Sequence, residues 1–266
     1  LQYHFIAFEK WTEKTDYQQP IIYIKSKLNK MIQQNQNKET ADYINNFSIS
    51  LKQTFRILRD VISHKSENYR NLVCLQRLGS FYPLLIKTYK FDETEDKNKF
   101  DKVCKYLEIL SFRVLALGGS RSDAGQTELH KLARDFSGKY ERLYDSLSTE
   151  INRLSSKKSF ETALRNTELY SSAKSNDISY LIWKYENHLR NSEQPVCSNM
   201  SEEEFLNGAT KKRLTVEHIA SQKVNTIIEN RDVLTNLNEL DLASNLHRLG
   251  NLTFDPADPL REYRTP

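Results

Sequence analysis

The stretches Leu214-Thr-Val-Glu-His-Ile219 and His247-Arg-Leu-Gly-Asn-Leu-Thr-Phe254 decide how this chain is divided into folding regions. In the first stretch, leucine and valine alternate with polar neighbours, which is the two-residue period of a half-buried strand. In the second, leucine and phenylalanine alternate with asparagine and threonine in the same way. We therefore expect two short strands near the C-terminus, in a chain whose other segments carry a different pattern.

Upstream of these strands, apolar residues recur at the three- and four-residue spacing of a helix face. One stripe, formed by Leu51, Phe55, Leu58 and Ile62, predicts a long helix from about Thr40 to His64. Four further stripes run from Val103 to Leu117, Leu129 to Phe136, Leu143 to Leu154 and Ile178 to Leu189. The fold class predicted is mostly α: a helical domain over residues 1–191, a polar connection, and a small α+β module over residues 200–266.

Composition narrows the function classes without selecting one. The chain carries 39 lysines and arginines against 35 acidic residues, a net charge of +4 that permits a nucleic-acid partner without demanding one. The three cysteines, Cys74, Cys104 and Cys197, form no C-x-x-C pair, which excludes a cysteine zinc cage and predicts a reducing compartment. No apolar run is long enough to span a membrane.

Glu217 and His218 stand where the first predicted strand should end. A histidine can take a proton from water near neutral pH, and an adjacent carboxylate can hold a hard cation such as Mg²⁺. Together they would supply an activated water and a metal ion for phosphodiester hydrolysis. Neighbouring side chains of a strict strand point to opposite faces, so this site requires the backbone to turn at His218. The alternative is a solvent-facing glutamate beside a hydrogen-bonded histidine.

Thr215-Val-Glu-His-Ile219, followed by Leu249-Gly-Asn-Leu-Thr253, resembles the C-terminal nuclease domain of the GmrSD-type modification-dependent restriction endonucleases. This is a branch of the HNH, or ββα-metal, nucleases, and the resemblance covers about the last 55 residues. Tyr180-Leu-Ile-Trp-Lys-Tyr-Glu186 resembles the helical part of such proteins less specifically. The resemblance implies a metal-dependent DNA endonuclease of the prokaryotic cytoplasm, acting against modified phage DNA and carrying an N-terminal nucleotide-hydrolysing domain that this sequence does not show.

Residue roles follow from the same resemblance. His218 matches the general base, Glu217 a ligand of Mg²⁺ or Mn²⁺, and Asn251 the middle asparagine that braces the loop or positions the base. Ala220-Ser-Gln222 stands where the family usually has a proline and a glutamine soon after the histidine. The last polar residue of the motif belongs on a helix after the second strand, and no His or Asn follows Asn251. We therefore expect a module truncated at its C-terminus, with its final ligand beyond Pro266.

Basic residues and a second histidine flank the two motifs. His247 and Arg248 precede the second strand and could contact a scissile phosphate or leaving oxygen, or form a solvated loop pair. Lys211, Lys212 and Arg213 could neutralise backbone phosphates, or simply lie in solvent at a domain edge. From Lys211 to the end, eight basic residues face eight acidic ones, so no strong basic surface is predicted there.

Two other functions stay open. The chain could be a non-catalytic helical interaction or regulatory domain with a degenerate nuclease remnant, and its oligomeric state, a homo-oligomer included, is not set by the sequence. Arg59 and His64 fit the R-x4-H pattern of ribonucleases resembling the HEPN family, but five residues place them poorly on one helix face. Gly118-Gly-Ser-Arg-Ser122 is interpreted as a helix–helix turn, and the aromatic residues from Tyr180 to Tyr185 as core packing.

Overall fold

The computed structural model describes residues 1–192, 200–201, 205, 214–219 and 245–256. The chain divides into two compact units. The first comprises Leu1–Ser111 and Arg121–Leu154, and the second comprises Phe112–Ser120 and Ser155–Pro266. Lys211–Arg213 and residues 193–199 of the polar connection lie outside the described residues.

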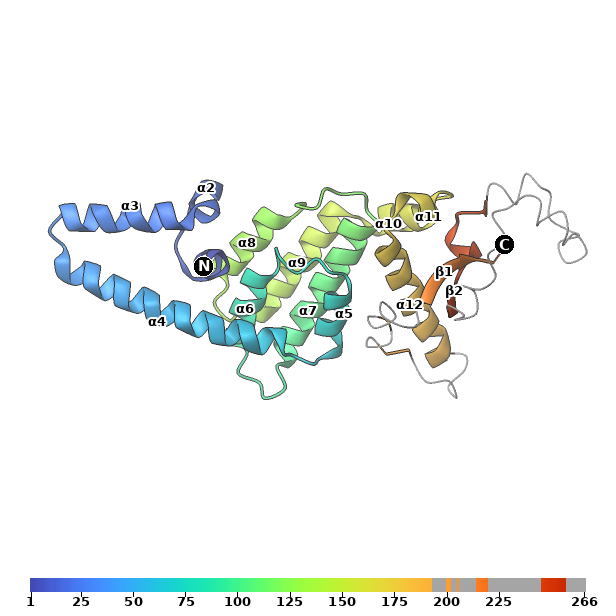
Figure 1. Cartoon of the computed structure of the whole chain (residues 1–266), viewed down its shortest axis with the longest axis horizontal. Coiled ribbons are helices and arrows are strands. Elements are labelled where there is room, and N and C mark those ends of the chain that lie inside the picture. Colours follow the sequence, from blue (N-terminus) through green and yellow to red (C-terminus); the bar gives the residue numbers. More distant parts are fainter. Residues whose placement is uncertain (193–199, 202–204, 206–213, 220–244, 257–266) are drawn as a thin grey trace, which may run out of the picture. The chain divides into compact units, whose positions relative to one another are not determined.

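The first unit is an array of helices, running from α1 to α9 in Figure 1. Their bounds are α1 Gln2–Phe8, α2 Lys14–Gln18, α3 Pro20–Gln33, α4 Asn37–Ile62, α5 Glu67–Cys74, α6 Tyr82–Phe91, α7 Asn98–Leu110, α8 Gln126–Asp135 and α9 Tyr140–Leu154. Ser66 caps α5, because its side-chain oxygen accepts a hydrogen bond from the Tyr69 amide. The starts and ends of α4, α8 and α9 lie close to those that the apolar spacing predicts.

Buried aromatic and aliphatic residues fill the centre of this unit, among them Phe5, Phe81, Phe100 and Leu107, each with no exposed area. One buried cation connects three helices of the array. The Lys87 ammonium, carried by α6, donates hydrogen bonds to the carbonyl of Ala7 (2.5 Å) and to that of Arg134 (2.8 Å). These carbonyls belong to the last turns of α1 and α8, where helices leave acceptors without intrahelical partners. Lys87 therefore satisfies two helix ends at once.

The long helix α4 forms as predicted, but only part of its predicted apolar stripe is covered, since Leu51 and Leu58 are half-buried and the other two members are exposed. Phe55 is 59% exposed and Ile62 is 56% exposed, whereas the buried side chains of α4 are Thr40, Thr54 and Val61. Apolar spacing indicates that a helix forms and gives its phase, but it does not say which neighbour covers the stripe. Besides these three buried side chains, the half-buried Tyr43 and Phe47 contact the rest of the unit, with their rings against Lys27 and His4.

The helix predicted to end before Gly118 does so, with a change of type in its last turn. After α7, residues Ser111–Ala116 form a π-helix, η1, whose wider turn is closed by the Leu117 amide donating to the Phe112 carbonyl at 3.1 Å. A Cβ atom at Gly118 would lie 2.7 Å from two backbone carbonyl oxygens. Only glycine fits at such a distance, so Gly118 ends the helix, and the following segment is a helix–helix connection as predicted.

The second unit packs three helices against a two-stranded sheet. The helices are α10 Lys157–Leu164, α11 Leu169–Ser172 and α12 Ser175–Ser192. Its core contains Leu117, Leu169, Ile178, Ile182 and Leu252, surrounded by half-buried apolar side chains. Leu117 directly follows η1, and the other four residues come from α11, α12 and the sheet, so residues 155–192 pack with the strands. The boundary expected after residue 191 therefore differs from the division of the structure, because α12 buries its apolar face within the C-terminal unit.

Helix α12 also buries a different face from the one that its apolar stripe suggests. Ile178, Ile182 and Trp183 are buried, whereas Tyr185 is 57% exposed. The prediction of core packing is thus right for Tyr180, which is 1% exposed, and wrong for Tyr185. The indole nitrogen of Trp183 donates to the Met200 carbonyl at 2.9 Å, which joins the helix to the segment that follows it.

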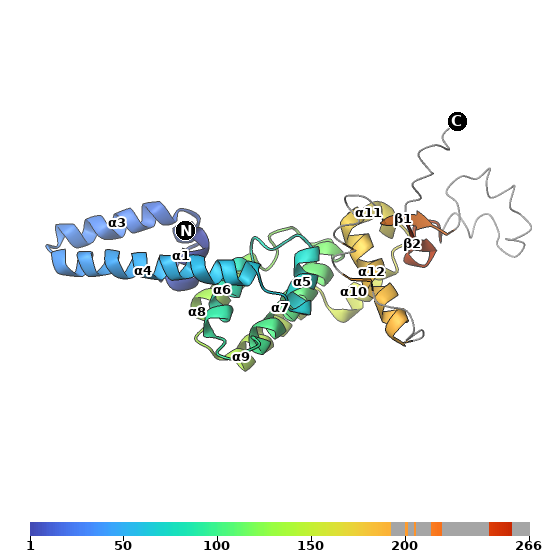
Figure 2. The ribbon, with the colours of Figure 1, turned by 60° about the horizontal axis from the view of Figure 1, so that its bottom comes forward.

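Both predicted strands are present and pair with each other. Strand β1 spans Leu214–His218, β2 spans Leu252–Pro256, and they run antiparallel with His218 opposite Leu252 (Figures 1 and 2). A short 3-10 helix, η2 (Leu249–Asn251), leads into β2. The described residues therefore form a mostly helical protein with one small sheet, and none of their helices is long and apolar enough to cross a membrane. The helix expected after β2 falls outside the described residues.

Candidate active site

The β1–β2 hairpin brings the two sequence motifs together. His218 is the last residue of β1, and Asn251 directly precedes β2, 33 positions later in the chain (218 to 251). Just past the last strand pair, the amide of Ile219 donates to the Asn251 carbonyl at 2.9 Å. The end of the first motif is therefore hydrogen-bonded to the centre of the second.

Asn251 fixes the turn that enters the second strand. Its side-chain amide donates to the Leu246 carbonyl at 2.8 Å, and its backbone amide donates to the Arg248 carbonyl at 3.0 Å. A side-chain amide that bonds the backbone of its own loop holds that loop in one conformation. Asn251 thus couples residues 246–251 to the end of β1.

Two imidazole rings and a phenol ring meet at this end of the hairpin. The ring centroid of His218 lies 4.5 Å from that of Tyr170 and 5.4 Å from that of His247, both in edge-on arrangements. Tyr170 and His247 are stacked at 6.0 Å, and the Tyr170 amide donates to the His247 carbonyl at 3.1 Å. Tyr170 lies in α11, so this short helix positions both histidines from one side.

Sequence reasoning missed Tyr170. It stands 48 positions before His218 (170 to 218), in a helix of four residues that carries no apolar period of its own. Its neighbour Leu169 is buried in the core of the second unit, which places the phenol ring at the strand end. The only sequence signal for Tyr170 was a single aromatic residue in a polar segment, and such residues are too common to identify a site.

Electrostatics at the hairpin favour a neutral His218. Partial burial lowers the pKa of His218, the nearby His247 lowers it further, and the Glu217 carboxylate acts in the opposite direction. The imidazole is therefore unprotonated at neutral pH and able to accept a proton. Next to it, Nδ1 of His247 is buried and has no hydrogen-bond partner among the residues that the structure describes.

Glu217 lies on the other face of the hairpin. It pairs with Thr253 across the sheet, and its Oε1 accepts a hydrogen bond from the Thr215 hydroxyl at 3.1 Å. Because strand side chains alternate, this face is opposite the one that carries Val216 and His218. Val216 packs against the core of the unit, so His218 faces the core side and Glu217 the outer side.

The predicted Mg²⁺ or Mn²⁺ site is not completed by these side chains. Within residues 1–192, 200–201, 205, 214–219 and 245–256, no group of three His, Cys, Asp or Glu residues could hold a metal ion. Glu217 and His218 diverge because the backbone stays extended through His218. Within the described residues, Glu217 and His218 therefore do not converge on one ion, and further ligands would have to come from outside these ranges.

The predicted DNA contacts are only partly described. Arg248 is exposed in the turn before η2, beside the half-buried His247. Lys211, Lys212 and Arg213 lie outside the described residues, as does Ala220-Ser-Gln222. Of the basic residues proposed to contact DNA, Arg248 is thus the one that the structure places next to the histidine pair.

Arg59 and His64 have different surroundings in the structure. The Arg59 guanidinium bonds to the Asp60 carboxylate at 3.1 Å on the surface of α4. His64 follows the end of α4, and its ring packs edge-on against Tyr69, Tyr89 and Phe100. Burial lowers the pKa of His64, as expected for an imidazole held among aromatic rings. We interpret His64 as a packing residue.

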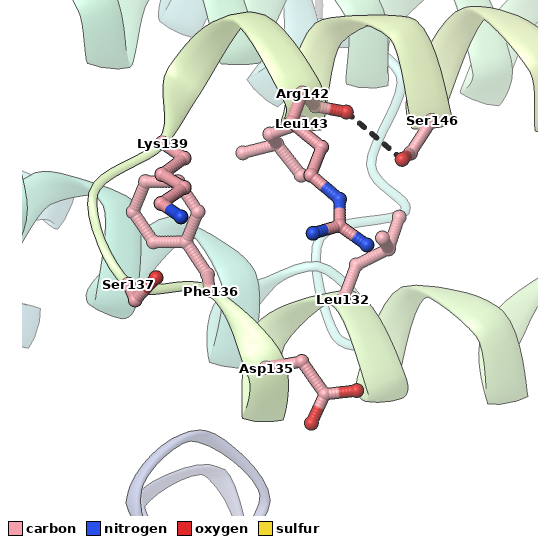
Figure 3. Close-up of a pocket in the computed structure, with 8 residues that line it drawn as sticks. All are labelled: Leu132, Asp135, Phe136, Ser137, Lys139, Arg142, Leu143 and Ser146. Carbon is pink, nitrogen blue, oxygen red and sulfur yellow. Dashed lines mark hydrogen bonds between the residues drawn. The ribbon is translucent and has the colours of Figure 1, made fainter.

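A pocket of about 240 Å³ lies between α8 and α9 in the first unit (Figure 3). Leu132, Phe136 and Leu143 form its apolar part, and Lys139 and Arg142 contribute positive charge. The Ser146 hydroxyl donates to the Arg142 carbonyl at 2.9 Å, so it serves the helix rather than a ligand. No motif marked these residues, because a mixed apolar and basic lining follows ordinary helix periodicity.

Comparisons with protein-family models, with characterised proteins and with solved structures found no match to this chain.

Proposed function

We propose that the second unit is the nuclease module of a metal-dependent DNA endonuclease of the HNH type. The observation that carries the proposal is the hairpin contact: the Ile219 amide, directly after His218, bonds the carbonyl of Asn251 at 2.9 Å. The two motifs whose resemblance suggests a nuclease are thereby adjacent in space. Prokaryotic defence against modified phage DNA, and control by a nucleotide-hydrolysing domain, are part of the same proposal.

His218 is the proposed general base. Its lowered pKa keeps the imidazole neutral at pH 7, so it can take a proton from water as that water attacks a phosphodiester. Tyr170 and His247 hold the ring edge-on and limit its rotation. Asn251 keeps the loop carrying His247 and Arg248 in place, and the exposed Arg248 would contact the phosphate.

A divalent ion, Mg²⁺ or Mn²⁺, would stabilise the developing phosphate charge and is proposed from the resemblance alone. Glu217 is the proposed ligand from the hairpin. Because it faces away from His218, the ion would also need ligands from residues outside the described ranges.

The test is plasmid nicking by the protein, with modified and unmodified DNA and with Mg²⁺, Mn²⁺ or EDTA. We expect metal-dependent nicking that His218→Ala abolishes. His188→Ala is the matched control, since His188 is an exposed histidine of α12 in the same unit. A thermal melt shows whether each variant stays folded. Equal nicking by the His218→Ala and wild-type proteins would remove His218 from the mechanism.

The second candidate function is a non-catalytic interaction or regulatory domain that retains a nuclease remnant. The divergence of Glu217 from His218, together with the lack of a three-ligand group in the described part of the chain, favours it. Under this function no DNA substrate is nicked with either metal, while the hairpin and its hydrogen bonds persist. Nicking that EDTA abolishes and Mg²⁺ restores would exclude it.

A further inference from the structure

The pocket between α8 and α9 is shaped by the turn that joins these helices. Helix α8 ends before Phe136, whose extended backbone leads into Ser137 and Gly138. Gly138 has a φ of +91°, a left-handed conformation that residues with a Cβ atom rarely adopt. The chain therefore reverses within a few residues, and α9 begins directly after Lys139 and faces α8 across the pocket (Figure 3).

One wall of the pocket is apolar. Leu132 is half-buried on α8, Phe136 is 7% exposed at the end of that helix, and Leu143 is 3% exposed on α9. The Phe136 ring is held in place by edge-on contacts with Phe91 and Tyr140. The cavity beside this wall measures about 240 Å³. That volume is slightly below the usual range of ligand pockets, and it suits a molecule of about ten non-hydrogen atoms.

Two cations share the pocket with this wall. Figure 3 shows the Arg142 guanidinium extending from α9 toward α8, and the Lys139 side chain at the end of the pocket nearest the turn. Neither side chain has an ion-pair or hydrogen-bond partner in the described part of the chain. Glu141 and Asp145 are exposed on α9 but lie outside the lining of the pocket. The guanidinium is therefore available to donate two parallel N–H groups to a carboxylate or phosphate.

The acidic residue that lines the pocket is already compensated. Both carboxylate oxygens of Asp135 accept hydrogen bonds from the Arg134 guanidinium, at 2.6 Å and 2.9 Å. These bonds hold the pKa of Asp135 below its usual range, so the carboxylate is ionised and its charge is balanced by Arg134. Lys139 and Arg142 therefore contribute two uncompensated positive charges to the pocket, which favour an anionic ligand.

We propose that this pocket binds a small organic anion with an apolar body, such as an aromatic carboxylate or phosphate monoester. The Arg142 guanidinium holds the anionic group from α9, and the Lys139 ammonium adds a second charge from the turn. The apolar body lies against Leu132, Phe136 and Leu143, where apolar surface is removed from water. The inference is independent of the nuclease proposal, because all of these residues belong to the first unit.

Amide NMR titration of the whole chain tests the site, with benzoate and phenyl phosphate as probes. We expect saturable shifts of the Ser137, Lys139 and Arg142 amides with at least one of these anions, and the comparison shows which anionic group is preferred. Inorganic phosphate lacks the apolar body, and benzyl alcohol lacks the charge. Each should bind at least about tenfold more weakly than the preferred anion, because each makes only part of the contacts.

Two substitutions test the role of the guanidinium. Arg142→Gln should weaken binding of the preferred anion at least about tenfold, because the amide keeps a donor but loses the charge. Lys131→Gln is the matched control: Lys131 is exposed on α8, pairs with Glu128 at 2.7 Å and does not line the pocket, so binding should be unchanged. Circular dichroism checks that both variants keep their helices.

Three results would overturn the proposal. The first is the absence of saturable shifts with both benzoate and phenyl phosphate. The second is equal binding by the wild-type and Arg142→Gln proteins, and the third is binding of benzyl alcohol or inorganic phosphate as tight as that of the preferred organic anion.

Discussion

The two units hold their histidines in opposite ways. In the first unit, His4 and His130 are almost completely buried, and burial lowers the pKa of each to about 4. In the second, His218 and His247 are half-buried, lie 5.4 Å apart, and stand at a strand end. A buried neutral imidazole fills space, whereas an accessible neutral imidazole can exchange protons with a substrate. Exposure therefore separates His218 from His4 and His130 more clearly than the pKa direction does, because burial lowers the pKa of all three.

The largest effect expected from this difference is acid destabilisation of the first unit. His4 and His130 have a folded-state pKa of about 4 against 6.5 when unfolded, so the unfolded state binds more protons as the pH falls below 6.5. Stability is fully present above pH 6.5 and is lost toward pH 4. Between pH 7 and pH 5 we expect a loss of roughly 3 to 4 kcal/mol in the free energy of unfolding, measured by urea denaturation.

Histidine substitutions test, by the same urea denaturation, whether the buried histidines of the first unit cause this pH dependence. His130→Gln should weaken the pH dependence markedly, because a neutral side chain takes up no proton. His188→Gln, at an exposed position, should leave it unchanged. An equal slope in wild type and His130→Gln would contradict the assignment of the acid effect to buried histidines.

A smaller loss is expected on removing the buried cation of the first unit. Lys87→Met keeps the length and apolar stem but leaves the Ala7 and Arg134 carbonyls without their shared donor. We expect about 2 kcal/mol of destabilisation at pH 7, the cost of unsatisfied buried acceptors. Lys90→Met, at an exposed position on the same helix, is the control and should change stability little.

In the second unit, Asn251→Ala should cost about 1 kcal/mol, because one half-buried hydrogen bond to the Leu246 carbonyl is lost. The effect should be local, appearing as faster hydrogen exchange of the Ile219 amide that bonds Asn251. Amides in the core of the first unit should keep their protection. Unchanged exchange at Ile219 would show that the side chain does not brace the hairpin.

The smallest effect concerns the titration of His218 itself. Its pKa is lowered by burial and then by His247, so its NMR titration midpoint should lie below 6.5. Removing the neighbouring charge with His247→Gln should move the midpoint upward, and Glu217→Gln should move it downward, since the carboxylate raises this pKa. Opposite directions in the two variants are the readout, and shifts of the same sign would contradict the electrostatic account.

Periodicity in the sequence predicted much of the local structure. It located α4, α7 with η1, α8, α9, α12 and both strands, because each carries a regular apolar pattern. It did not predict which side of α4 or α12 is covered, since Phe55 and Tyr185 belong to regular stripes and are nevertheless exposed. Which face of a helix is buried depends on helices that are distant in the chain, and a local pattern carries no information about them.

The sequence selected some residues that the structure brings together, but not the geometry between them. His218 and Asn251 were selected from separate motifs, and the hairpin places them together. The divergence of Glu217 follows from strand alternation, and the sequence left open whether the backbone turns at His218. Tyr170 reaches the site only through the packing of Leu169, a tertiary contact with no signature in the sequence.

The π-helical turn Ser111–Ala116 makes the length of the chain a determinant of side-chain orientation. A π-helical turn holds about one residue more than an α-helical turn, so removing one residue there lets ordinary α-helical geometry resume and leaves the residues after the turn in the same orientation. Within the turn itself the remaining side chains are redistributed around the helix. Phe112 and Ala116 pack against the core of the second unit, so a deletion between them should cost one of these contacts although no apolar residue has been replaced.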